Sequence, residues 1–213
     1  MKILTGIISS LTLLSLNVVG LSQVQAQTQG FQLQNVPVSF AGSGCPEGKI
    51  QGVLNGDTLS ITFSAFEAKA RRSQVVAASC NLRIGLSVPS GFNVQPINVK
   101  YLGFADVPTK GSADLNVKIL FQGQEVPTND NPNQKFNAGF SDVWSKDVGI
   151  TLNTINACKN PVSSVFGINS TLIARATNVP SKPKGLETQI RIDTIDTTIG
   201  PVLFQIKFDF NPC

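Results

Sequence analysis

The chain has 213 residues, four cysteines, no histidine and a formal net charge of +4. Because histidine is the commonest general base and the commonest metal ligand, its absence excludes a Ser-His-Asp or Cys-His nucleophile in its usual form. The charges are scattered, with no basic run longer than Arg71-Arg72, which falls short of the clustered basic face typical of proteins that bind nucleic acid.

The start of the chain has the three parts of a secretory signal peptide. Lys2 supplies a positive charge, residues 3–21 carry no charge, and Val24-Gln25-Ala26 has the small-residue shape of a cleavage site. Cleavage is favoured over retention as a membrane anchor, because Thr, Ser, Asn and Gly dilute an apolar run that would need ~20 mostly apolar residues to cross a bilayer. The sequence therefore predicts a cleaved signal peptide at 1–26, a secreted protein in an extracellular or periplasmic location, and no membrane span after cleavage.

The next part of the chain changes from a polar lead-in to alternating strands. Residues 27–40 are Gln-rich and predict an extended lead-in to a single domain at 41–213. Asn55-Gly56 is a strong hairpin signal, because both central residues of a type I′ turn need a positive φ. Apolar residues then alternate with polar ones over 57–66 and 80–88, which predicts two strands with one buried face each.

The remaining elements continue this pattern to the C-terminus. Residues 92–104 predict a broken strand pair with Pro96 at an edge or a bulge. Residues 122–148 predict a long polar connection, and loops of this length are often mobile or functional. Strands are predicted at 113–121, 168–177, 189–195 and 202–210. Strands bounded by Gly, Pro and Asn, with little helical periodicity, predict an all-β fold: a single-domain antiparallel β-sandwich, jelly-roll-like or Ig-like.

Four cysteines in an exported chain predict two disulfides. Three pairings are open, and we favour Cys45–Cys80, which would tie a loop to a core strand, and Cys158–Cys213, which would pin the chain end. A zinc site made of four thiolates, or a redox centre, is not favoured, because the cysteines are widely spaced and none forms a C-x-x-C pair. We expect no metal ion and no cofactor.

Carboxylates leave one catalytic alternative, since glycoside hydrolysis needs only two of them. The alternative function is a carboxylate-dependent hydrolase acting on extracellular polysaccharide. The oxygen-rich run 129–133 could suit calcium, but Pro132 interrupts it and a plain turn is favoured. We assign no catalytic residue, because none of the four glutamates stands in a recognisable acid/base context: Glu47, Glu67, Glu125 and Glu187.

Carbohydrate binding is a further candidate activity for an exported β-sandwich, and it usually relies on exposed aromatic rings. Trp144, in the long polar region, and Tyr101 are the candidate ligand contacts. For Trp144, a tryptophan folded back over the core is favoured over an exposed ring. Asn169-Ser170-Thr171 is an N-glycosylation sequon on a predicted strand, relevant only in a eukaryotic secretory pathway.

A set of short motifs runs along the chain around its cysteines: Ala41-Gly42-Ser43-Gly44-Cys45-Pro46-Glu47-Gly48, Ser79-Cys80-Asn81-Leu82, Pro89-Ser90-Gly91-Phe92, Tyr101-Leu102-Gly103-Phe104-Ala105, Ala157-Cys158 and the terminal Cys213. These motifs resemble those of the DUF4360 family, a group of uncharacterised secreted proteins of fungi and bacteria, cyanobacteria among them. The chain departs from the family pattern at Ser79 and Lys159. The resemblance covers about Phe40 to Cys213 and implies no catalytic residue, because the family carries no established activity.

Together these observations predict a secreted, disulfide-stapled β-sandwich without catalytic function. We expect an extracellular or cell-envelope module with a binding or structural role. The expected partner is an extracellular polysaccharide or an envelope protein.

Overall fold

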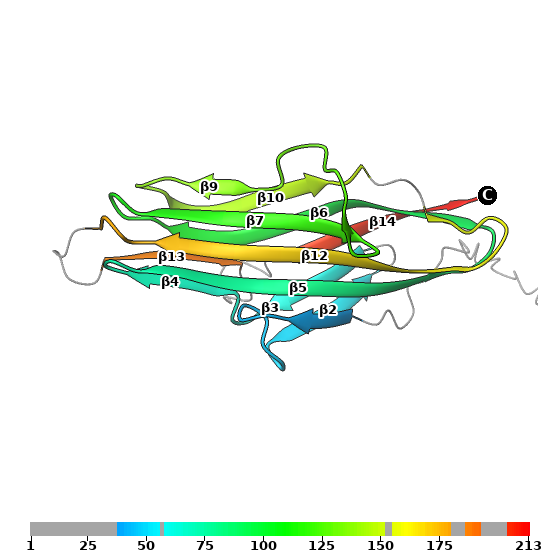
Figure 1. Cartoon of the computed structure of the whole chain (residues 1–213), viewed down its shortest axis with the longest axis horizontal. Helices are drawn as coiled ribbons and strands as arrows, with labels where there is room; N and C mark the ends of the chain where they lie inside the picture. The colour runs from blue at the N-terminus through cyan, green and yellow to red at the C-terminus, as the bar shows by residue number, and fades with distance from the viewer. Residues whose placement is uncertain (1–37, 56–57, 152–154, 180–185, 193–203) are drawn as a thin grey trace, which may run out of the picture.

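The computed structural model describes residues 38–55, 58–151, 155–179, 186–192 and 204–213, and every regular element in that part of the chain is a β-strand (Figure 1). The predicted signal peptide and all but the end of the predicted lead-in lie outside the described residues. The strands form two antiparallel sheets that enclose one hydrophobic core. The predicted all-β antiparallel sandwich is therefore confirmed.

The two sheets differ in size. The six-stranded sheet has the order β1-β5-β12-β7-β8, with β9 also pairing with β7. Its strands are β1 (Val38–Ala41), β5 (Val75–Val88), β7 (Ser112–Phe121), β8 (Gln124–Glu125), β9 (Gln134–Phe136) and β12 (Val162–Arg175). The eight-stranded sheet has the order β2-β3-β14-β6-β13-β4, with β10 and β11 also pairing with β6. Its strands are β2 (Ile50–Asn55), β3 (Thr58–Phe63), β4 (Glu67–Arg71), β6 (Phe92–Asp106), β10 (Ser141–Gly149), β11 (Ile155–Asn156), β13 (Glu187–Ile192) and β14 (Phe204–Pro212).

Alternation along β5 decides which side chains enter the core. Cys80 and Leu82 are both 1% exposed, whereas Asn81 and Arg83 lie on the outward side of the strand. β12 alternates in step with β5 because the two strands pair in a continuous register, and β7 alternates in step with β12 for the same reason. The strict apolar–polar pattern of the sequence therefore places one row of side chains in the core and the other on the outer surface of the six-stranded sheet.

The predicted hairpin after Asn55 joins β2 to β3. Asn55 pairs with Thr58, and the rest of the predicted turn, at Gly56, lies outside the described residues. This hairpin forms one end of the eight-stranded sheet, beyond β14.

The expectation of a broken strand pair at 92–104 is wrong, because this segment lies within the single strand β6. The pairing with β14 shifts register along this strand: Asn98 pairs with Lys207, but Phe208 pairs with Pro96. Such a bulge is where a strand tolerates a proline, which has no N–H to donate. Pro96 therefore lies beside a register shift within β6 and does not end the strand.

The expectation of one long polar connection over 122–148 is also wrong, because strands β8, β9 and β10 occupy much of this segment. Its first half joins the two sheets along one side of the sandwich. Val126 N donates to Ile119 O of β7 at 3.0 Å, and Asn129 N donates to Gly149 O of β10 at 2.9 Å. These backbone hydrogen bonds attach the polar segment to one strand of each sheet.

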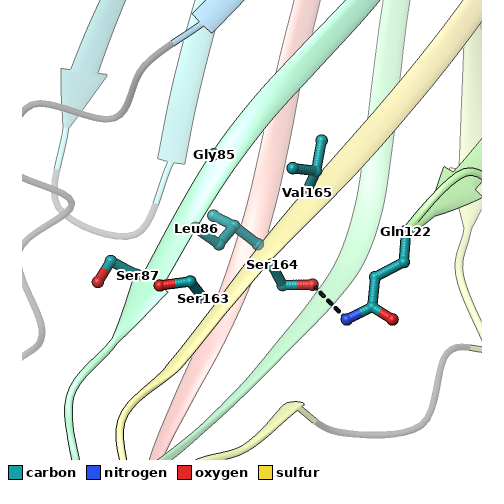
Figure 2. A pocket seen from close by; sticks show the side chains of 7 residues that line it. All are labelled: Gly85, Leu86, Ser87, Gln122, Ser163, Ser164 and Val165. Carbon is teal, nitrogen blue, oxygen red and sulfur yellow. Dashed lines mark hydrogen bonds between the residues drawn. The ribbon is translucent and has the colours of Figure 1, made fainter.

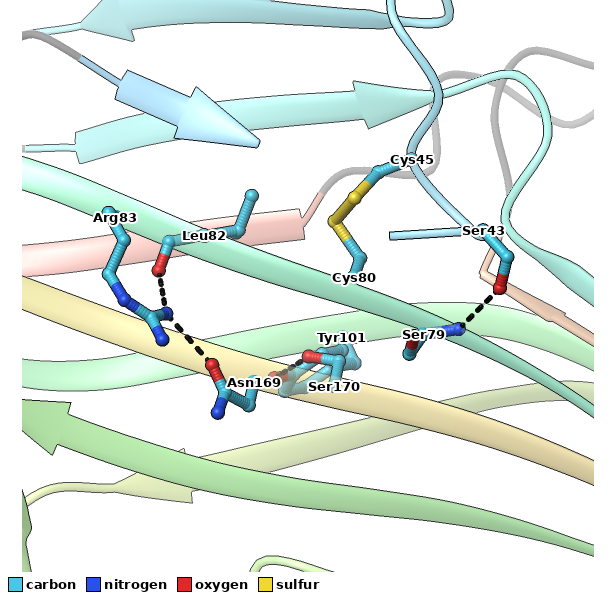
Figure 3. Close-up of a disulfide and its surroundings, with 9 residues drawn as sticks. All are labelled: Ser43, Cys45, Ser79, Cys80, Leu82, Arg83, Tyr101, Asn169 and Ser170. Atoms are coloured by element: carbon cyan, nitrogen blue, oxygen red, sulfur yellow. Dashed lines mark hydrogen bonds between the residues drawn. A yellow bond between two sulfur atoms is a disulfide. The ribbon is translucent and has the colours of Figure 1, made fainter. Parts of the chain in front are cut away.

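Each of the two predicted disulfides ties an irregular segment to the sandwich. Cys45–Cys80 joins the crossover between β1 and β2 to β5 (Figure 3). Cys158–Cys213 joins the ends of β11 and β14, which flank the start of β6. Cys213 N also donates to Gly91 O at 2.9 Å, so both a covalent and a backbone contact hold the chain end.

Glycine lets the crossover approach β5 closely enough for the first disulfide. Gly42 has a φ of +138°, and a Cβ at this position would lie 2.1 Å from the carbonyl oxygen of Ser79. Gly44 N donates to the same oxygen at 2.8 Å. The Gly-Ser-Gly-Cys run therefore positions Cys45 opposite Cys80 through close backbone contact.

A buried hydrogen bond links the sheets across the core. The hydroxyl of Tyr101 on β6 lies 2.9 Å from the hydroxyl of Ser170 on β12, and the tyrosine is fully buried (Figure 3). Burial raises the pKa of Tyr101 well above its ordinary value of 10.0, and the hydrogen bond from Ser170 lowers that pKa by a smaller amount. The folded protein therefore holds this proton at a pH where the unfolded chain releases it.

Because the pKa of Tyr101 is raised in the folded protein, the free energy of unfolding should fall in alkaline solution. The contribution of Tyr101 is fully present below pH 10.0 and is lost as the pH rises from there through the folded-state pKa. We expect a slope of up to about 1.4 kcal/mol of unfolding free energy per pH unit. Urea unfolding of the wild type and of Tyr101→Phe across this range measures it, and parallel pH curves for the two proteins would contradict the account. Tyr101 is the only tyrosine, so tyrosinate absorbance follows its ionisation directly.

Candidate functional site

The outward surface of the six-stranded sheet carries a group of polar side chains on three adjacent strands. The register pairs Asn81 with Asn169 and Asn169 with Lys118 in one row, and the neighbouring row pairs Thr171 with Asn116. Together with Arg83 these side chains form what we call the polar face: Asn81, Arg83, Asn116, Lys118, Asn169 and Thr171. Because all of them stand on core strands of the sandwich, a rigid scaffold positions them.

Arg83 is the charged centre of the polar face. Its Nη1 donates to the backbone carbonyl of Leu82 at 2.6 Å and to Oδ1 of Asn169 at 2.8 Å, and Figure 3 shows the guanidinium between these two groups. The side chain lies across Gly167, where a Cβ would come within 3.2 Å of Nη1. The missing side chain at Gly167 therefore leaves the space in which the guanidinium lies against the sheet.

The other amides and hydroxyls of the polar face are available for a ligand. Among the residues that the structure describes, the side chains of Asn81, Asn116 and Thr171 have no hydrogen-bond partner. Asn81 and Thr171 are partly exposed, and Asn116 is exposed. Each can donate or accept without breaking a contact within the protein.

A hollow of 610 Å³ lies farther along β5 and β12, two of the three strands that carry the polar face (Figure 2). Its lining residues come from β5, β12 and the turn after β7: Gly85, Leu86, Ser87, Gln122, Ser163, Ser164 and Val165. Here β5 and β12 extend past the last pairs that they make with β1 and β7. Val165 is 45% exposed, so the hollow offers an apolar contact beside hydroxyl groups. Its volume is in the range of ligand sites in proteins.

The side chain of Gln122 forms one wall of this hollow. Its Nε2 donates to Ser164 Oγ at 3.4 Å, and its backbone N donates to Val165 O at 2.9 Å. Both contacts hold the turn after β7 against β12, and Figure 2 shows the first of them.

The structure contradicts the choice of Trp144 and Tyr101 as candidate ligand contacts, because both side chains lie in the core. Trp144 is 6% exposed and Tyr101 is fully buried. Trp144 points inward from β10 and packs on Phe136, with ring centroids 5.2 Å apart. Neither ring has a free face that a sugar could stack on.

One outward aromatic side chain of the other sheet is Phe104, a residue that sequence reasoning did not single out as a contact. It lies on β6 beside Val143, which is 56% exposed. The guanidinium of Arg191 lies 5.2 Å from the ring centroid, so an internal cation–π contact already covers this ring. The alternation of β6, with Tyr101 inward, was the available signal for the outward position of Phe104.

Carboxylate side chains whose burial the structure describes are all at least partly exposed. Glu67, Glu125 and Glu187 form ion pairs of 3.1 to 3.4 Å with lysine or arginine side chains on neighbouring strand positions. Among the carboxylates whose burial is described, none is buried facing a second one, the arrangement that would favour the hydrolase alternative.

Side-chain oxygens of the run at 129–133 accept hydrogen bonds from backbone N–H groups. Asn133 Oδ1 accepts from Val117 N of β7 at 2.8 Å, and Asn131 Oδ1 accepts from Asn133 N at 3.0 Å. These bonds support the plain-turn interpretation of this segment. No cluster of three acidic, cysteine or histidine residues suited to a metal ion occurs among the described residues.

The sequon lies on β12, as predicted. Asn169 faces outward in the polar face and accepts a hydrogen bond from Arg83, whereas Ser170 is buried against Tyr101.

Among the residues that the structure describes, no helix has the length and apolarity that a membrane crossing requires.

Comparison with known proteins places this chain beside proteins without an assigned activity. A family model described as "Domain of unknown function (DUF4360)" matches residues 30–213. An "Uncharacterized secreted protein" of the fungus Arthroderma benhamiae is 24% identical over 175 residues, which are 80% of this chain and 70% of that protein. The likeness to this relative agrees with the predicted signal peptide, and the chain is a secreted protein.

The chain was also matched to a solved structure, that of TmCBM61 in complex with beta-1,4-galactotriose. The match covers 83% of this chain and 89% of that chain, with 11% sequence identity and a TM-score of 0.25.

Proposed function

Since this chain belongs to the DUF4360 family and is secreted, we propose that it is a non-catalytic extracellular binding module that holds a polysaccharide against its polar face. A polysaccharide presents many hydroxyl groups along an extended chain. The side chains that match this chemistry are amides, hydroxyls and a guanidinium arranged on a rigid surface.

One observation carries this proposal. Asn81, Asn116 and Thr171 keep their hydrogen-bonding groups free of any partner in the described part of the chain, and the hollow beside Val165 adds an apolar contact. Outward sheet faces are commonly polar because water solvates them. The combination of unpartnered amides with a hollow in the size range of ligand sites is what favours binding over solvation.

Removing two of these amides should weaken binding without unfolding the protein. Asn81→Ala/Asn116→Ala deletes two hydrogen-bonding side chains that have no partner in the described part of the protein, so we expect about tenfold weaker binding and an unchanged thermal unfolding temperature. Affinity electrophoresis of the secreted, oxidised protein through gels that contain neutral or acidic polysaccharides measures the change.

The matched control is Asn98→Ala, which removes the same kind of side chain from the outward side of β6 in the other sheet. It should bind like the wild type. An equal loss in the control would place the ligand elsewhere, and a wild type that no polysaccharide retards would overturn the proposal in favour of a protein partner or a structural role.

A further inference from the structure

Arg83 is a partly buried cation that forms no ion pair with any residue in the described part of the chain. Its two partners, the Leu82 carbonyl and the Asn169 amide, are both neutral. Removing a charge from water is costly unless an opposite charge or a full set of hydrogen bonds compensates it. The surroundings of Arg83 therefore leave its charge without a counter-charge.

The neighbouring charges of this surface are already paired. Lys118 lies 3.2 Å from Glu125, and Arg175 forms an ion pair with Asp114. Cationic side chains outnumber carboxylates on the outward side of the described strands of this sheet: Arg83, Lys118, Lys135 and Arg175 against Asp114 and Glu125. The local field around Arg83 is positive.

The orientation of the guanidinium leaves one complete edge free. Both hydrogen bonds of Arg83 come from Nη1, so Nε and Nη2 have no partner among the described residues. Two parallel N–H groups in this fork match a carboxylate or a sulfate in a bidentate pair. Asn169 holds Nη1 and Gly167 leaves the space beneath it, so the fork is fixed in place before a ligand arrives.

From this geometry we infer that the ligand is an acidic polysaccharide, and that Arg83 binds one carboxylate or sulfate group of it through Nε and Nη2. The inference rests on the proposed function and names the class of its ligand. Asn81 and Thr171 then contact neighbouring hydroxyl groups of the same chain. The free side chains of the polar face supply affinity, and Arg83 supplies selectivity for charge.

The test compares polymers that share a backbone but differ in charge. Polygalacturonate is compared with its methyl ester, and dextran sulfate with dextran, at the same ionic strength. The wild type should bind the charged member of at least one pair ten times or more tightly than the neutral member, and the preferred pair identifies carboxylate or sulfate. This preference should weaken with added salt.

Arg83→Gln keeps a hydrogen-bonding group but removes the charge, and it should abolish the preference. Arg83→Lys should keep only part of it, because a lysine cannot form the bidentate pair. The matched control is Arg72→Gln, an exposed arginine after β4 whose loss changes the net charge equally. This control should retain the preference.

The outcomes separate the two proposals. Equal binding to charged and neutral polymers, or a preference that survives Arg83→Gln, overturns the inference about Arg83 and leaves the proposed function standing. Binding to none of the polymers overturns both. Trp144 fluorescence of each variant shows that the fold is intact.

Discussion

Replacing Cys45 and Cys80 by alanine should lower the free energy of unfolding by about 5 kcal/mol, and the same change at Cys158 and Cys213 by at most about 4 kcal/mol. Loop closure alone does not predict this order. The bridged residues are 35 apart in the first pair and 55 apart in the second, and these separations give nearly equal entropic terms of about 4 kcal/mol.

Burial makes the difference between the two disulfides. Cys45 and Cys80 are 3% and 1% exposed and belong to the core, whereas Cys213 is exposed. Alanine at the buried pair therefore leaves small cavities in addition to a free loop, which costs roughly 1 kcal/mol more. Urea unfolding of the two double variants measures both values. A larger loss at the Cys158–Cys213 pair would contradict the role assigned to the buried disulfide.

Gly103→Ala should lower the free energy of unfolding by about 3 kcal/mol. Gly103 lies on β6, where a Cβ would come within 2.2 Å of the carbonyl oxygen of Arg191 and 2.5 Å of Cζ2 of Trp144. The first contact is with the backbone of β13, which cannot move away without breaking its pairing with β6. Either the strands separate or the indole leaves its place beside Phe136.

The control for this variant is Gly52→Ala on β2, where the nearest atom would be 3.9 Å from the new Cβ. It should change stability by less than about 0.5 kcal/mol. Trp144 is the only tryptophan, so its emission should shift to longer wavelength in the Gly103 variant and remain unchanged in the control. Equal stability of the two variants would show that Gly103 is not confined as the structure has it.

Strict alternation is what made part of this fold predictable. In β5 and β7 every second residue is apolar, and these residues are buried as the pattern predicts. β10 breaks the pattern, because Val143 and Trp144 are adjacent and only Trp144 faces inward. A strand of this kind is recognised only from its partner, since pairing with β6 determines which of two neighbouring apolar residues is buried.

The candidate site was less predictable for a related reason. Asn81, Arg83 and Asn169 occupy polar positions of predicted strands, where a solvated surface is the ordinary expectation. Their importance depends on cross-strand neighbours far apart in the sequence: Arg83 reaches Asn169 over Gly167. Trp144 follows the interpretation that the sequence favoured, a tryptophan folded back over the core, because packing on Phe136 buries it.

The most direct test of the central claim is to map the bound polysaccharide on the protein by nuclear magnetic resonance. Backbone amide shifts of the secreted, oxidised protein would be followed during titration with oligomers of the polymer that it binds. The account predicts shifts concentrated on β5, β7 and β12 around Arg83 and Asn169. Shifts concentrated instead on β6 and β13 around Phe104, in the opposite sheet, would contradict it.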